Sequence, residues 1–108
     1  MIINQHNSTA IITQDKTSLP EFLKKFSVLH ERFKKNDVIL VLKDELSSGA
    51  SDQLVTLSHT HRHLNYSFVV VTTQLNQDDF EDDLIIVPSL QEAHDYIEME
   101  LMQRDLGF

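Results

Sequence analysis

Three short apolar runs, separated by segments of helical pattern, constrain this chain most. Residues 38–42, 68–71 and 84–87 consist wholly of Val, Ile, Leu and Phe. Runs of this length are typical of strands covered on both faces, the usual situation in a parallel sheet. They are far shorter than the roughly 20 residues that cross a bilayer. The sequence therefore predicts a buried sheet and no membrane partner.

Amphipathic patterns fill the intervals between these runs. Ser18 and Glu21 have the spacing of a capping box, and apolar residues then recur every three or four positions. The expected core face of this first helix is Phe22, Leu23, Phe26, Leu29 and Phe33, and Asn36-Asp37 ends it. A second helix is expected to start near Ser48 or Ser51 and to end at Asn65. Its core face is Ala50, Leu54, Leu57, His61 and Leu64.

A second capping box, Ser89 with Glu92, predicts a C-terminal helix. Its expected core stripe is Leu90, Ala93, Ile97 and Leu101. Residues 1–7 and 9–14 carry β-branched side chains around Asn7-Ser8, and they predict a hairpin. The acidic segment 78–83 is expected to be a loop with at most one helical turn. The predicted order is ββαβαβ(turn)βα.

This order predicts an α/β fold in one domain over residues 1–108. Helices between buried strands imply a mixed, mostly parallel sheet with helices packed on it. Charge and composition exclude several classes of function. The chain has nine Lys and Arg residues and 17 Asp and Glu residues, so its net charge is -8. This negative charge argues against nucleic acid and anionic lipid as partners.

Several kinds of site are excluded by composition. The absence of Cys rules out disulfides, thiolate zinc sites and a cysteine nucleophile, and two glycines leave no phosphate-binding glycine-rich loop. No cofactor is expected. The N-terminus lacks a basic stretch followed by a long apolar run, so we expect a cytoplasmic protein.

Three features resemble the STAS domain of anti-sigma-factor antagonists, one of which is the pair of N-terminal strands over residues 1–7 and 9–14. The run 38–42 leads to Ser47-Ser48-Gly49 at a helix start, and residues 87–93 (VPSLQEA) resemble the family's entry into its last helix. The resemblance implies a STAS-like sandwich in which a partner kinase phosphorylates Ser47 or Ser48. Leu46 stands where the antagonists have Asp. The alternative is that Ser47, Ser48 or Ser51 is simply a helix N-cap.

The chain also resembles small proteins labelled ribonuclease Z, which end in a similar acidic helix and Arg-Asp-Leu-Gly-Phe tail. The zinc motif of ribonuclease Z is His-x-His-x-Asp-His. His59 and His61 match its first two positions, but His63 and Leu64 occupy the last two, so the motif is not present. Function in RNA processing, as a protein or subunit, remains the alternative interpretation.

Helical geometry separates the three histidines. At about 100° per residue, His61 falls on the apolar face of the second helix, whereas His59 and His63 point nearly opposite. We expect His61 to be partly buried and hydrogen-bonded. His59 and His63 are expected to be surface residues, or at most a weak two-ligand metal site.

We therefore predict a non-catalytic intracellular interaction or regulatory module. Its partner would be another protein, such as a kinase-type regulator, and a homodimer is the alternative. The candidate interaction residues are Ser47, Ser48, Gly49, Ser51, Met102 and Phe108. Met102 and Phe108 belong to a tail that either binds a partner or docks onto its own sheet.

Overall fold

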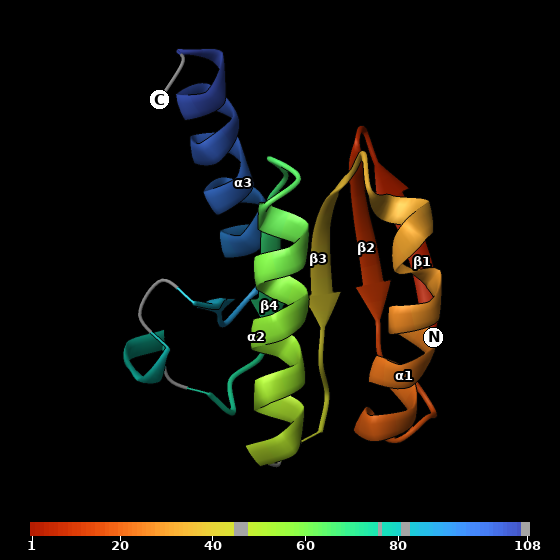
Figure 1. The fold of residues 1–108 in the computed structure, drawn as a ribbon. Helices are drawn as coiled ribbons and strands as arrows, with labels where there is room; N and C mark the ends of the chain where they lie inside the picture. Colours follow the sequence, from red (N-terminus) through yellow and green to blue (C-terminus); the bar gives the residue numbers. More distant parts are fainter. Residues whose placement is uncertain (45–47, 76, 81–82, 107–108) are drawn as a thin grey trace.

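The computed structural model describes residues 1–44, 48–75, 77–80 and 83–106, and it is built on a five-stranded mixed sheet (Figure 1). The strands are β1 (Ile2–His6), β2 (Thr9–Thr13), β3 (Asp37–Val41), β4 (Phe68–Val71) and β5 (Ile85–Val87). The helices are α1 (Leu19–Leu29), α2 (Ser48–Arg62) and α3 (Leu90–Asp105). Two short 3-10 helices, η1 (His30–Phe33) and η2 (Gln77–Asp79), accompany them. The predicted α/β class is confirmed.

The strands lie in the order in which they occur in the chain, β1-β2-β3-β4-β5. β1 and β2 form the predicted antiparallel hairpin, and each later neighbour pairs parallel. Asn7 adopts φ 57 in the hairpin loop, a conformation that asparagine tolerates better than most residues. Because these pairs are parallel, β2, β3 and β4 all begin at the same end of the sheet.

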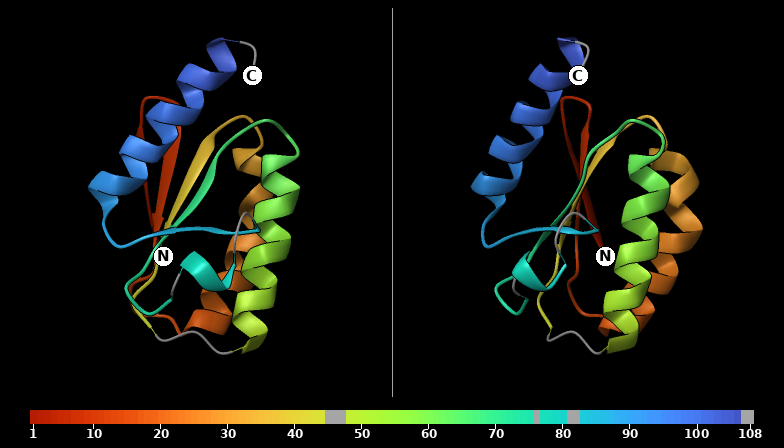
Figure 2. Two further views of the ribbon diagram at one scale, coloured as in Figure 1. Left: turned by 90° about the vertical axis from the view of Figure 1, so that its left-hand side faces the viewer. Right: turned by 60° about the vertical axis from the view of Figure 1, so that its left-hand side comes forward.

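Helices cover both faces of the sheet (Figure 2). α1 and α2 lie on one face, where Val38, Leu40, Phe68 and Val70 join the larger core cluster. α3 covers the other face, where Ile39 and other alternate strand residues pack against Ala93 and Ile97. This alternation is why the strands read as continuous apolar runs. Within the described residues, every helix is too short or too polar to span a bilayer.

The serine half of each predicted capping box is confirmed. The Ser18 hydroxyl accepts a hydrogen bond from the Glu21 N–H at 3.5 Å, and the Ser89 hydroxyl accepts one from the Glu92 N–H at 3.2 Å. Each serine satisfies a backbone donor that has no partner within the helix. The two boxes thus set where α1 and α3 begin.

Four details of the sequence-based prediction are wrong. Asp37 was expected to end a helix, but it is buried and begins β3. Leu64 is 38% exposed because α2 ends at Arg62. Leu90 and Leu101, expected in the core, are 40% and 38% exposed. A helix of 16 residues is about 24 Å long and outreaches strands of three to five residues, so its ends lack a surface to pack on.

Candidate functional site

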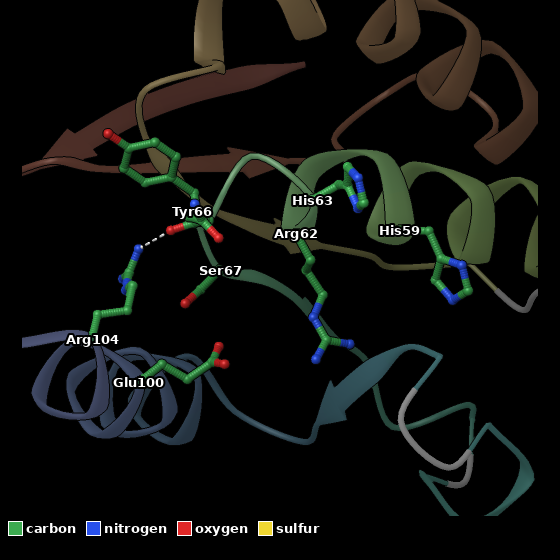
Figure 3. A pocket seen from close by; sticks show the side chains of 8 residues that line it. His59, Arg62, His63, Tyr66, Ser67, Glu100 and Arg104 are labelled. Atoms are coloured by element: carbon green, nitrogen blue, oxygen red, sulfur yellow. Dashed lines mark hydrogen bonds between the residues drawn. The ribbon is translucent and has the colours of Figure 1, made fainter. Parts of the chain in front are cut away.

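Polar side chains gather at the end of the sheet where β3 and β4 begin. A pocket of about 420 Å³ opens there, between the end of α2, the start of β4 and the C-terminal half of α3. Figure 3 shows Arg62 and Glu100 entering it from α2 and α3, with Ser67 between them. The lining residues are His59, Arg62, His63, Asn65, Tyr66, Ser67, Glu100 and Arg104. Acid and base groups together suit a polar ligand that both donates and accepts hydrogen bonds.

A buried ion pair ties α3 to the starts of β3 and β4. Asp37 is 1% exposed, and its carboxylate accepts a hydrogen bond from the Ser67 N–H at 2.8 Å. Arg104 donates to the same carboxylate, with Nη2 at 3.1 Å from Oδ1 and 3.3 Å from Oδ2. Its Nη1 donates to the Asn65 carbonyl, and its guanidinium lies 5.6 Å from the centre of the Tyr66 ring. Arg104 is thus held in place rather than free to bind a ligand.

Two buried histidines form a hydrogen-bonded pair between η1 and α2. His30 Nε2 lies 2.8 Å from His61 Nδ1, and His61 Nε2 lies 2.7 Å from the carbonyl oxygen of Asn36. A carbonyl only accepts, so His61 Nε2 carries a hydrogen; in the neutral pair, His61 Nδ1 accepts from the Nε2–H of His30. The rings of Phe26 and Phe68 lie beside the pair. The predicted hydrogen bonding of His61 is confirmed, its ring is fully rather than partly buried, and its partner His30 was missed.

Burial lowers the pKa of both histidines. His61 is fully buried and His30 is 9% exposed. Loss of water is the largest cause that holds the pKa of each ring below its usual value of 6.5. Glu31 raises the pKa of His30, and the Asn36 carbonyl raises that of His61, but both effects are smaller. Both rings are therefore neutral in the folded protein at pH 7.

We expect the free energy of unfolding to fall as the pH decreases from about 6.5 to about 5.5. Unfolding returns both pKa values to near 6.5, so the unfolded chain takes up protons that the folded chain excludes. The stability is fully present above pH 6.5 and is lost as the pH falls toward the lower pKa values of the folded state. The slope for each histidine is at most about 1.4 kcal/mol per pH unit. Urea denaturation at a series of pH values measures it.

A double variant, His30→Gln with His61→Gln, provides the comparison, because glutamine keeps a hydrogen-bonding side chain without a titrating ring. Its stability should vary less between these pH values, even though it starts lower. His59→Gln removes a ring that is 57% exposed and should keep the wild-type pH dependence. An unchanged pH dependence in the double variant would show that other groups cause it.

His59 on α2 and His63 in the turn after it are both exposed, as the sequence predicts. His59 Nε2 lies 3.1 Å from Asp83 Oδ1, and both histidines line the pocket. Across the described ranges, no three His, Cys, Asp or Glu side chains are arranged to hold a metal ion. Two histidines alone make a weak metal site.

The predicted phosphorylation residues lie at the entrance to α2. Ser47 and the side chain of Ser48 fall outside the described residues, and α2 begins at Ser48. Gly49 is exposed and Ser51 is half-buried. A Cβ atom added at Gly49 would meet nothing within 4 Å, so this position needs no glycine for space. Phosphorylation here stays a prediction.

A buried glutamine fixes the chain that leads to this entrance. Gln14 follows β2 and is 1% exposed. Its Oε1 accepts a hydrogen bond from the Lys43 N–H at 2.9 Å, and its Nε2 donates to Asp44 Oδ2 at 2.8 Å. Nε2 also donates to the Thr17 carbonyl at 3.1 Å. These bonds tie the start of the connection from β3 to α2 onto the end of β2.

The C-terminal half of α3 presents apolar side chains to solvent. Met99, Met102 and Leu106 are 46%, 66% and 69% exposed. The last turns of α3 extend past the end of the sheet (Figures 1 and 2), so docking of this tail onto its own sheet, one of the two sequence-based alternatives, is wrong for Met102. Phe108 lies outside the described residues.

Comparison with protein-family models and with curated proteins finds no match for this chain. The resemblance to STAS domains stays a prediction from short motifs.

Proposed function

We propose that this chain is a non-catalytic regulatory module of the cytoplasm that binds another protein, in the manner of a STAS-like anti-sigma-factor antagonist. The observation that carries the proposal is a second apolar stripe on α3. Met99, Met102 and Leu106 follow one another at three- and four-residue spacing. At about 100° per residue they lie about 140–200° from the buried Ile97.

This stripe points away from the sheet that α3 covers. One face of α3 packs through Ala93 and Ile97, so the opposite face has no role in the helix's own packing. Exposed apolar side chains that line up on one helix face favour a partner that buries them. Methionine side chains adapt to the shape of such a partner.

The charge on α3 indicates the chemistry of that partner. The helix carries five acids, at positions 92, 95, 98, 100 and 105, and a single base, Arg104. Arg104 is bonded to Asp37 on the sheet side. A partner that fits this surface therefore offers an apolar groove or helix bordered by Lys and Arg, because opposite charges steer association and select the partner.

The order of the elements along the chain supports the STAS-like part of the proposal. The strands lie in sequence order, and α1 and α2 pack on the same face of the sheet. α2 begins at Ser48, a few residues after β3 ends at Val41. In this proposal, phosphate on Ser47 or Ser48 switches partner binding, since a helix start favours negative charge.

Photo-cross-linking in the cells that express this protein tests the proposal. A photoreactive residue at Met102 should form an adduct with another protein, and one at the exposed Gln53 on α2 should not. Replacing both Met99 and Leu106 by glutamate should abolish the adduct. The same adducts from both positions, or none from Met102, would contradict the proposal. Mass analysis of the protein isolated from these cells checks Ser47 and Ser48 for phosphate.

A further inference from the structure

The two edges of the sheet differ in length. Among the described strands, β1 forms one edge beside β2, and β5 forms the other beside β4. β1 has five residues and β5 has three. In an antiparallel pair, alternate residues direct their N–H and C=O groups to the neighbour, so the remaining groups of β1 point outward. The longer edge offers these groups to another strand.

Charge protects the β5 edge and not the β1 edge. β5 contacts η2, which carries Asp78 and Asp79, and Asp83 comes shortly before the strand. Two such edges repel each other. β1 reads Ile-Ile-Asn-Gln-His and contains no Asp, Glu, Lys, Arg or Pro, the residues that keep edge strands from pairing.

Exposed apolar side chains of β1 lie on both faces of the sheet. Ile2 and Ile3 are 46% and 39% exposed, and strand alternation places them on opposite faces. Beside Ile3, a groove of about 820 Å³ lies between the N-terminal strand and α1. Met1, Ile3, Val28 and Leu29 line it, and Val28 is 76% exposed.

We propose that β1 pairs antiparallel with β1 of a second copy of this chain, which joins the two sheets around a two-fold axis. The strand is self-complementary in this arrangement: pairing centred on Asn4 sets Ile3 opposite Gln5 and Ile2 opposite His6. Two-fold pairing is also the commonest arrangement of identical chains. The dimer would cover both grooves.

Charge favours a second copy as the occupant of this edge. The groove carries Glu21 together with Lys24 and Lys25, so two copies related by a two-fold axis present both signs to each other. The strand order places the acidic segment beside β5 at the opposite edge of the sheet. Pairing through β1 therefore keeps the acidic edges of the two copies apart, which limits repulsion between chains of net charge -8.

Sedimentation velocity of the purified chain tests the dimer. The wild type should have twice the mass of one chain at about 100 μM, a concentration at which a micromolar dimer is formed. Ile3→Lys adds a charge to the edge and should give a monomer. Leu64→Lys changes a leucine of similar exposure, 38%, at the end of α2 and should leave the dimer intact. A monomeric wild type, or a dimer that Ile3→Lys leaves intact, would overturn the proposal.

Cysteine cross-linking supplies a second readout, because the chain has no natural cysteine. Asn4→Cys should oxidise rapidly to a disulfide-linked dimer, since a residue paired with itself across two antiparallel strands lies within disulfide reach. Thr60→Cys, on the exposed side of α2, should not. Failure of Asn4→Cys and of both neighbours, Ile3→Cys and Gln5→Cys, to cross-link would exclude this pairing. Met102→Ser should not change the mass, which separates this dimer from partner binding through α3.

Discussion

Phe26→Ala should reduce the free energy of unfolding by about 3–5 kcal/mol. Phe26 is fully buried on α1, and its ring centre lies 5.7 Å from that of His30, 6.3 Å from Phe33 and 6.2 Å from Phe68. It therefore joins α1, η1 and β4 in one cluster. Truncation removes both apolar burial and these ring contacts, and the rigid surroundings leave a cavity. Because a domain of this size has about 5–15 kcal/mol in all, the loss is large.

Chemical denaturation followed by circular dichroism measures this loss. The control is Met102→Ala on α3, where the side chain is 66% exposed and the change should stay within about 0.5 kcal/mol. A loss below about 1 kcal/mol for Phe26→Ala would mean that the aromatic cluster contributes little to the core.

Arg104→Met should cost about 3 kcal/mol, the second large effect. The substitution keeps apolar volume but leaves the Asp37 carboxylate, which is 1% exposed, without its counter-charge. Only the Ser67 N–H bond among the contacts described above would remain to it. Arg104 is itself 27% exposed, so water reaches part of the site and holds the loss to the lower end of the range for buried ion pairs.

A double-mutant cycle distinguishes loss of the ion pair from loss of packing. Asp37→Asn removes the charge and keeps the shape, so the double variant Asp37→Asn with Arg104→Met should be more stable than the sum of the single losses implies. Additive losses would show that the two side chains do not stabilise each other. Denaturation of all four proteins at pH 7 gives the comparison.

The alternation of apolar runs and helical patterns was enough to predict the α/β class and the succession of elements. Local chemistry placed several boundaries. Ser18 and Ser89 cap their helices as expected, and Asn7 turns the hairpin. These signals act between residues close in sequence, which is why they can be recognised without the fold.

Most features that the sequence did not predict depend on contacts between residues distant in the chain. Asp37 has low strand propensity, yet it begins β3 because Arg104, 67 residues later, compensates its buried charge. The signal was present: Arg104 lies on the same side of the last helix as Ile97. His30 likewise stands four residues after Phe26, on the core side of its helix. Its pairing with His61 depends on how η1 and α2 pack.

The sequence predicts Met102 as an interaction residue, but only the sheet shows which face of α3 is exposed. The sequence shows apolar residues around most of this helix, and Leu90 and Leu101 were expected in the core with Ala93 and Ile97. The short strands limit how much of α3 can be covered. The structure thus divides the apolar residues of α3 into a buried set and an exposed set, and the exposed set supports the proposed function.

The most direct test of that function measures the affinity of the cross-linked partner for purified variants by calorimetry. Met102→Ser with Leu106→Ser should weaken binding at least about tenfold, or about 1.4 kcal/mol, with unchanged stability. Leu64→Ser, which changes an exposed leucine just after α2, should bind as the wild type does. Equal affinity of the wild type and the α3 variant would contradict the proposal that this protein binds its partner through α3.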